Sequence, residues 1–337
     1  MGKNVKVEKI RDSSLDAICG IFICFMIMGH AFQWSHIEND EFYHYSNMFL
    51  FMFMGWFFYK SGMFHKLKDF TFIVKYNARK LLVPYIVYSI LGELFYWIYL
   101  YQNDLLNLKE IIRNPILDII HYGSVAGNTP LWFLLSLFVV KAVMALIDKY
   151  EAKYSIVFLV SVIIAGGGCY VSKLFQYVPY IVINSALGFV LYITGYYLRD
   201  LQYKKYTLVI SLISFLIISI SCPCYIDFRS DNVENGSWLV AVIYNIAGIV
   251  IINNIFKMKF LQLPVLTCIG CNSMDYYCIH WILFYLTVII IGVDATETEN
   301  YTELYTLLFS SIIFLPAITY WHSLLKDIKW NNILIKS

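Results

Sequence analysis

The chain consists almost entirely of apolar segments about as long as a membrane-spanning helix, separated by short polar loops. A spanning helix needs about 20 predominantly apolar residues, and a hydropathy window of about 19 residues finds ten such segments. No internal repeat and no linker rich in proline or serine divides them. We therefore predict an all-α polytopic membrane protein, a single domain over residues 1–337. Its expected spans are 15–35, 45–64, 81–101, 131–148, 154–172, 178–198, 207–224, 237–256, 271–292 and 302–322.

The composition excludes two broad classes of protein. Hydrophobic residues make up 60% of the chain and charged residues 14%, against roughly 45–50% and 25% in soluble domains. The 25 Lys and Arg residues nearly balance the 23 Asp and Glu residues, so no basic excess is available to neutralise nucleic-acid phosphates. We expect a lipid bilayer around the chain, no soluble domain of normal size and no nucleic-acid partner.

The basic residues are distributed unevenly over the predicted loops. With the amino terminus inside, nineteen of the 25 lie in cytoplasmic segments, whereas Lys109, Arg113, Lys173 and Arg229 lie outside. Short cytoplasmic loops are enriched in Lys and Arg, so both termini are predicted to be cytoplasmic. The first apolar segment lacks a small-residue cleavage site and is read as an uncleaved span. The expected location is a cell membrane, either a bacterial inner membrane or a plasma membrane.

Cysteine spacing gives no metal-binding pattern. Cys222 and Cys224 form one close pair and Cys268 and Cys271 another, but neither has a second pair at the ligand spacing of a zinc site. Cysteines within the apolar runs are interpreted as small packing residues. We predict no metal and no tightly bound cofactor.

Two titratable residues in the first span are candidates for function, because ionisable groups are costly inside a membrane. His30 lies about 15 residues into the span, roughly 22 Å from its cytoplasmic end at 1.5 Å per residue. Asp16 lies near that cytoplasmic end. Each also has a purely structural interpretation. His30 could hydrogen bond a neighbouring helix, and Asp16 could be an acidic residue favoured in the first helical turn.

Further polar residues lie in or beside later spans, each with two interpretations. Lys60 is near the cytoplasmic end of the second span, where it could bind an anion or extend to the headgroups. Arg79 begins the third span in the most cationic loop, which could bind phosphate or only fix topology. Asp275 and His280 are five residues apart in the ninth span, so they are expected to have different partners.

Five blocks of sequence, taken together and in order, resemble the acyltransferase family 3 integral-membrane proteins, especially the branch that looks like fucose 4-O-acetylases. The family is implied to have about ten spans and to move an acyl group, usually acetyl from acetyl-CoA, to a sugar hydroxyl of a surface polysaccharide or lipid-linked glycan. The five blocks are Leu15-Asp16 to Gly29-His30, Trp56 to Gly62, Arg79 to Tyr85, Pro130 to Leu134, and Ile269 to Trp281.

The resemblance implies roles for particular residues. It makes His30 the catalytic residue, supported by Asp16, and it places Lys60, Ser61 and Arg79 at the acyl-CoA donor. Trp132, Asn272 and His280 are then expected at the glycan acceptor. Where the family usually has Arg or Lys eleven residues before this histidine, the chain has Cys19; Lys60, at similar depth, is expected to replace that cation.

The chemistry leaves two mechanisms open. His30 could take the hydroxyl proton as a general base, or accept the acyl group itself and pass it on. Two rival functions are a glycan transporter or flippase and a non-catalytic scaffold. Transporter folds often carry inverted repeats, which are not visible here.

Overall fold

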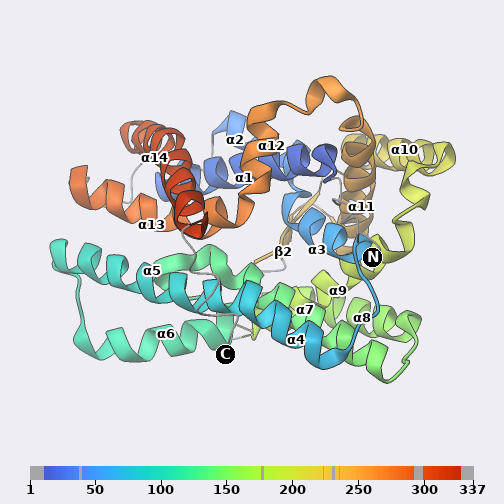
Figure 1. Cartoon of the computed structure of the whole chain (residues 1–337), viewed down its shortest axis with the longest axis horizontal. Coiled ribbons are helices and arrows are strands. Elements are labelled where there is room, and N and C mark those ends of the chain that lie inside the picture. The colour runs from blue at the N-terminus through green and yellow to red at the C-terminus, as the bar shows by residue number, and fades with distance from the viewer. Residues whose placement is uncertain are drawn as a thin grey trace, which may run out of the picture.

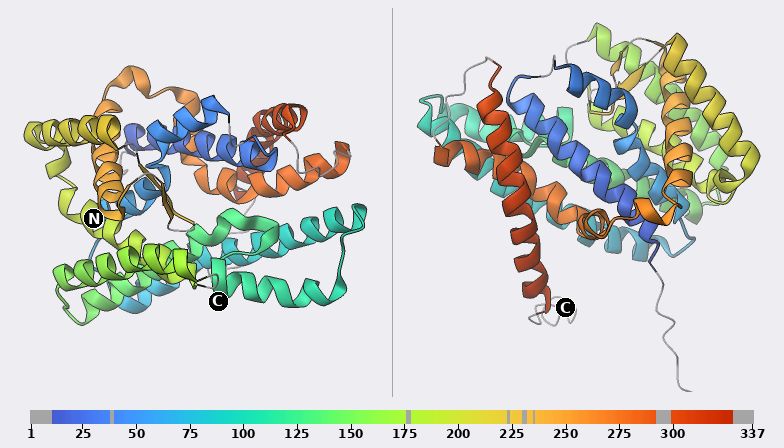
Figure 2. Two further views of the ribbon diagram at one scale, coloured as in Figure 1. Left: turned by 180° about the vertical axis from the view of Figure 1, so that it is seen from behind. Right: turned by 90° about the horizontal axis from the view of Figure 1, so that it is seen from above.

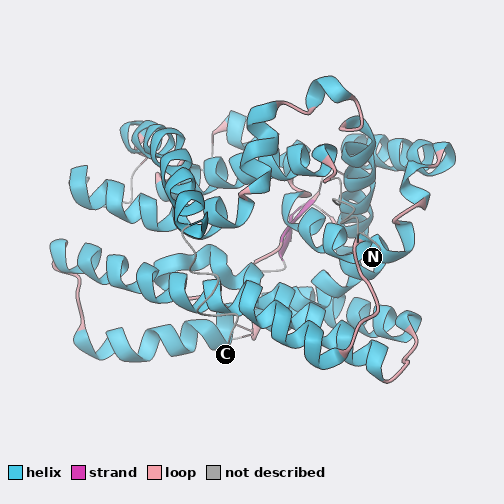
Figure 3. Cartoon of the chain, viewed as in Figure 1, coloured by secondary structure: helices cyan, strands magenta, loops and turns pink. Residues whose placement is uncertain are grey.

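Helices form nearly all of the structure, with one short hairpin of strands among them (Figure 3). The computed structural model describes residues 11–37, 40–175, 178–222, 224–229, 232–234, 236–291 and 299–327. The predicted termini at 1–10 and 328–337 lie outside these residues. The main elements are α1 (Ser13–Trp34), α2 (Glu41–Leu50), α3 (Phe53–Met63), α4 (Phe70–Asn77), η1 (Ala78–Leu82), α5 (Val83–Gln102), α6 (Leu108–Tyr122), η2 (Ala126–Leu131), α7 (Trp132–Lys149), α8 (Tyr154–Leu174), α9 (Tyr180–Leu198), α10 (Lys205–Ser221), β1 (Tyr225–Asp227), β2 (Asn232–Glu234), α11 (Trp238–Ile255), α12 (Pro264–Cys271), α13 (Ser273–Ile291) and α14 (Tyr301–Asp327).

Eight helical stretches of the described chain are long and apolar enough to cross a membrane. They correspond to eight of the ten predicted spans within a residue or two at the ends or enclose them, which confirms an all-α polytopic membrane protein. The predicted span 207–224 corresponds to the apolar helix α10, which is shorter, at 17 residues. The ten-span count and the placement of both termini in the cytoplasm stay predictions.

The predicted span 45–64 was wrong as one continuous helix. Its residues form α2 and α3, with a turn at Phe51 and Met52 between them. Asn47 in its first half and His44 just before it are polar residues that line a cavity together with Phe51. A break in a membrane helix is tolerated where the backbone faces protein or a cavity rather than lipid, and this break meets that condition.

Side-chain caps fix where several helices begin. Asp12 accepts a hydrogen bond from the backbone N–H of Ser14 at the start of α1, and Asp40 does the same for Phe42 at the start of α2. Asp69 and Ser237 cap α4 and α11. Each cap satisfies an N–H group that the helix leaves unpaired in its first turn, so these boundaries follow from local sequence.

The helices lie in two layers in Figure 1. Helices α1, α2, α12, α13 and α14 lie above, α4 to α9 lie below, and the β1–β2 hairpin runs between them. The views in Figure 2 show the same division from behind, and α14 on the outside of the bundle. This hairpin lies in the connection between α10 and α11.

Glycines allow two pairs of helices to approach backbone to backbone. A Cβ on Gly62 of α3 would lie 1.9 Å from the carbonyl oxygen of Tyr192 in α9, and one on Gly195 of α9 would lie 2.1 Å from that of Tyr59. In the same way, a Cβ on Gly270 of α12 would lie 1.8 Å from the carbonyl oxygen of Asp16. Such close crossings are typical of helix packing in membranes.

A buried polar network connects α3 to α11 and to the loop after α9. Trp56 donates its indole N–H to Asn253 (2.8 Å), and the amide of Asn253 donates to Gln202 (2.8 Å). Gln202 also accepts from the hydroxyl of Tyr59 (3.1 Å). Interhelical hydrogen bonds of this kind stabilise membrane bundles by about 1 kcal/mol each, so the network helps to fix the position of α3.

Candidate active site

His30 lines a cavity of about 540 Å³ formed mainly by α1, the α2–α3 region and residues 226–229 at the end of β1. The segment around Pro130, together with Tyr277 and Trp281 of α13, closes the rest of its wall. The His30 side chain is half-buried, and the edge of Trp281 contacts its ring at a centroid distance of 5.2 Å. A ligand in this cavity would therefore meet one imidazole that is both accessible and fixed in position.

The ring of His30 is held by His280 of α13, which is fully buried. Nδ1 of His30 lies 2.9 Å from Nε2 of His280, and the two rings are nearly parallel, with planes 10° apart. Nδ1 of His280 lies 2.8 Å from the backbone carbonyl oxygen of Tyr277. Both histidines belong to the sequence blocks that carry the family resemblance, but the sequence did not predict a contact between them.

The carbonyl at the end of this chain determines the tautomers. A carbonyl oxygen can only accept, so Nδ1 of His280 carries a proton and donates to Tyr277. Charged imidazoles would be costly at this depth, so His280 is neutral and its Nε2 is an acceptor. Nδ1 of His30 must then donate to that atom. Nε2 of His30 is left unprotonated, with its lone pair available.

The segment before α7 is clamped to α13 beside the two histidines. Asn128 donates its amide to the backbone carbonyl of Cys278 (3.0 Å), and the hydroxyl of Tyr277 donates to the carbonyl of Pro130. These bonds place Trp132, the predicted acceptor residue, in the wall of the His30 cavity, where it is buried to 5% exposure. Two of the sequence blocks thus meet at one site.

Arg229 also lines this cavity, and sequence reasoning missed it as a functional residue. It follows β1, its side chain is exposed, and its charge acts electrostatically on His30. The amide of Asn184 holds its backbone by donating to the Arg229 carbonyl (3.0 Å). A signal was present in the sequence, because an arginine in a loop predicted to be external runs against the general distribution of positive charge.

The predicted donor residues lie on α3 and η1, away from His30 along the bundle. Lys60 is half-buried, with its ammonium 4.7 Å from the centre of the Trp56 ring, and it acts electrostatically on Cys19 of α1. Ser61 follows it and is also half-buried, whereas Arg79 is exposed on the π-helical turn η1. The Lys60 side chain therefore packs on Trp56 within the bundle rather than extending away from it.

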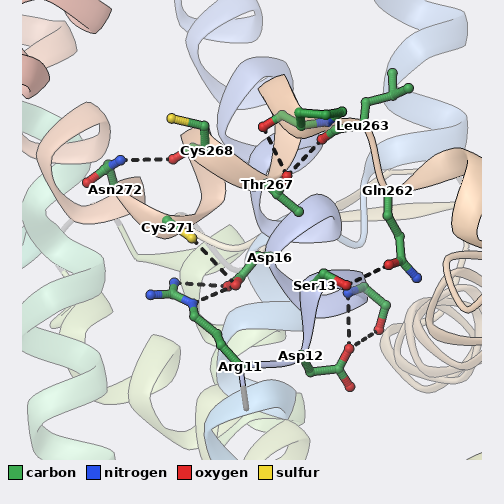
Figure 4. A network of polar contacts seen from close by, with 12 residues as sticks. Arg11, Asp12, Ser13, Asp16, Gln262, Leu263, Thr267, Cys268, Cys271 and Asn272 are labelled. Carbon is green, nitrogen blue, oxygen red and sulfur yellow. Dashed lines mark hydrogen bonds and ion pairs between the residues drawn. The ribbon is translucent and has the colours of Figure 1, made fainter. Parts of the chain in front are cut away.

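Asp16 and Asn272 are not brought to His30. Asp16 is 14 residues before it on the same helix, roughly 21 Å by helical rise. Its carboxylate accepts two hydrogen bonds from Arg11 (2.5 and 2.9 Å) and one from the thiol of Cys271 (3.6 Å). Asn272 donates to the carbonyl of Cys268 where α12 ends. Figure 4 shows both residues in a polar network that holds the start of α1 against α12.

The described residues include no cluster of three or more His, Cys, Asp or Glu side chains that could hold a metal ion. The polar groups that line the His30 cavity are imidazole, guanidinium, hydroxyl, amide and carboxylate groups, the last from Asp227.

Comparison with known families gives one match, and it covers most of the chain. The family model Acyl_transf_3, described as an acyltransferase domain, matches residues 12–321. Searches of curated proteins and of solved structures return no match. The match includes α1, the η2 segment and α13, which carry the His30 cavity. The chain therefore belongs to this family of membrane acyltransferases.

Proposed function

We propose that the protein transfers an acetyl group from acetyl-CoA to a sugar hydroxyl of a surface polysaccharide or lipid-linked glycan, in the manner of fucose 4-O-acetylases. The observation that carries the proposal is the chain of hydrogen bonds from the Tyr277 carbonyl through His280 to His30. It leaves an oriented lone pair on Nε2 of His30 beside a cavity, which is what removal of a hydroxyl proton requires.

In this mechanism His30 is the general base. Its Nε2 takes the proton as the hydroxyl oxygen attacks the thioester carbonyl carbon. The resulting oxyanion collapses, the carbon–sulfur bond breaks, and the thiolate of CoA takes the proton back from Nε2. During these steps Nδ1 keeps its proton and its bond to His280, which holds the ring in place. Arg229 of the same cavity is placed to donate a guanidinium hydrogen bond to the oxyanion as it forms.

The donor is proposed to bind with its phosphates at the cytoplasmic side, near Lys60 and Arg79. The electrostatic effect of the Lys60 ammonium on Cys19 supports the use of Lys60 in place of the family's cation. Under this proposal Lys60→Met raises KM for acetyl-CoA and leaves KM for the acceptor nearly unchanged, and adding Cys19→Arg partly restores donor binding. Unaltered acetyl-CoA kinetics in Lys60→Met would exclude this role.

Membership of an acyltransferase family favours enzymatic function over the transporter and scaffold alternatives. The two histidine mechanisms predict different intermediates, because an acyl-carrying His30 would form a covalent acetyl-imidazole. Rapid quenching of enzyme mixed with radiolabelled acetyl-CoA and no acceptor distinguishes them. Direct transfer predicts no label on the protein.

The central test is acetyl transfer by purified protein from acetyl-CoA to a panel of saccharides. The release of the free CoA thiol measures the reaction. A general base contributes roughly 10²- to 10⁴-fold to the rate, so His30→Ala should reduce turnover by that factor while the protein still inserts and folds. A suitable control is His36→Asn, because His36 is exposed and has a positive φ of 56° that asparagine tolerates. Transfer by His30→Ala at the wild-type rate would remove His30 from the mechanism.

A further inference from the structure

A second cavity, of about 610 Å³, adjoins the one that holds His30. The two cavities share four lining residues, Thr129, Asp227, Arg229 and Trp281. Its remaining walls come from Tyr96 of α5, from α6 and the segment after it, from Tyr180 at the start of α9 and from Tyr285 of α13. Both volumes are within the range of about 300–1,000 Å³ of small-molecule sites, and together they exceed what one reacting ring needs.

The lining of this second cavity is aromatic and polar in nearly equal measure. Tyr96, Tyr285 and Trp281 present ring surfaces, with Tyr96 and Tyr285 at a centroid distance of 5.7 Å. Tyr122 and Tyr180 stack on one another nearby, and the Arg229 guanidinium lies 5.4 Å from the centre of the Tyr122 ring. Aromatic faces beside hydrogen-bonding groups are suited to sugar rings, which have apolar faces and polar edges.

One hydroxyl at this cavity has no hydrogen-bond partner. Ser124 lines the cavity and is only 2% exposed, yet no described residue offers a partner to its Oγ. A buried polar group left unpaired destabilises the protein by roughly 1–3 kcal/mol. A ligand hydroxyl in the cavity would supply the bond that the protein does not.

The charges of the cavity disfavour an anionic ligand. Arg229 is the cation of the lining, and it faces two carboxylates there, those of Asp118 and Asp227. The backbone N–H of Arg229 also donates to the carboxylate of Asp227 (3.0 Å). A guanidinium balanced in this way is suited to hydrogen bonds with neutral hydroxyls rather than to binding a phosphate or carboxylate.

We infer that the second cavity binds a further, non-reacting sugar ring of the acceptor, so that the acceptor is a neutral glycan of at least two sugars. This inference rests on the proposed acetyl transfer to a sugar hydroxyl. The reacting ring occupies the cavity at His30, and the next ring lies against Tyr96 and Trp281 with a hydroxyl bonded to Ser124. Binding of the remote ring then helps to hold the reacting hydroxyl at Nε2 of His30.

The test compares acceptors of one and two sugars. Methyl glycosides of fucose, rhamnose, glucose, galactose and mannose are assayed beside disaccharides that carry the same sugar at the non-reducing end. The inference predicts a higher kcat/KM for a disaccharide. Ser124→Ala should lower that value about 3- to 10-fold, the loss of one hydrogen bond, and Tyr96→Leu should lower it about 10-fold. Neither should change kcat/KM for the monosaccharide.

Ser124→Ala is the decisive variant, because a hydroxyl without a protein partner can be removed without loss of fold. Asp104→Asn serves as its control, since Asp104 is exposed in the loop before α6 and does not line either cavity. Equal effects of Ser124→Ala on both acceptor lengths, or no effect on either, would overturn the second site and leave the proposed function standing. Absence of transfer to every saccharide, with or without the substitutions, would overturn both.

Discussion

The imidazoles of His30 and His280 are 250 residues apart in the sequence, and their facing nitrogens are 2.9 Å apart. His280 is placed to position His30 rather than to touch a substrate, because its two ring nitrogens are engaged by His30 and by the Tyr277 carbonyl. The sequence-based assignment of His280 to acceptor binding therefore gives way to a proposal that it positions the base.

For His280→Ala we expect kcat to fall about 100-fold with little change in KM, because His30 loses the acceptor that fixes its tautomer. His280→Gln restores an acceptor oxygen and should recover part of the rate. The pH profile of kcat checks this role, since its acidic limb should move when the partner of His30 changes. A loss of protein without a change in the profile of the folded fraction would show a packing role only.

The crossing of α3 and α9 predicts a position that does not tolerate side chains. Gly62→Ala should destabilise the protein by about 1–3 kcal/mol, the cost of overpacking, because its Cβ would meet the Tyr192 backbone. Gly167→Ala in α8 is the matched control, since nothing lies within 4 Å of its Cβ. Thermal unfolding in detergent should separate the two variants, and equal midpoints would contradict the close approach.

Asp16 is expected to act on stability rather than on the chemical step. Its carboxylate is 7% exposed, but the Arg11 side chain is 60% exposed, so solvent weakens the pair. We expect a coupling of at most about 1 kcal/mol in the cycle of Asp16→Asn, Arg11→Met and the double variant. Turnover of the folded Asp16→Asn protein should stay within about tenfold of wild type. A loss of more than about 100-fold would return Asp16 to the catalytic machinery.

A buried histidine in the loop between α3 and α4 should make stability depend on pH. Burial lowers the pKa of His65 below its ordinary value, although the carboxylate of Asp148, 3.1 Å away, opposes the shift. The hydroxyl of Tyr192 also bonds the ring, and Lys141 disfavours its charge. The unfolded chain then takes up a proton first as pH falls, so this stability is present above about pH 6.5 and is lost below it.

Unfolding midpoints measured between pH 5 and 8 test this expectation. The wild-type midpoint should decrease on the acidic side, and His65→Gln should show a flatter dependence. A wild-type midpoint that rose toward acid would mean that the ion pair with Asp148 dominates over burial.

The topology can be tested by reporter fusions after residues 70, 104, 203 and 236. Fusions after 70 and 203 should report cytoplasmic locations, and those after 104 and 236 external ones. This orientation places nineteen of the 25 basic residues in cytoplasmic segments, where Lys and Arg are enriched in membrane proteins. A reversed report at any of the four positions would change the number of spans before it.

Hydropathy and charge were sufficient to predict the helical class and most of the spans, because the bilayer requires apolar helices of nearly fixed length. They did not predict the break between α2 and α3, because a hydropathy average over a window conceals a turn that faces a cavity. The His30–His280 contact could not be predicted for a different reason. Two ionisable residues in separate helices reveal that each needs a partner, but which helices pack together depends on small residues and loops along the whole chain.

The two glycines between α3 and α9 also limit how the molecule can move. Each glycine faces the backbone of the opposite helix, Gly62 that of Tyr192 and Gly195 that of Tyr59, so sliding either helix along the other would drive a side chain into a carbonyl. The pair is therefore one rigid body, to which the end of α3 that carries Lys60 is fixed. If an acceptor of the proposed reaction needs the bundle to open, the opening is then expected from elements on the other side of the turn at Phe51 and Met52, with α3 and α9 as the stationary wall.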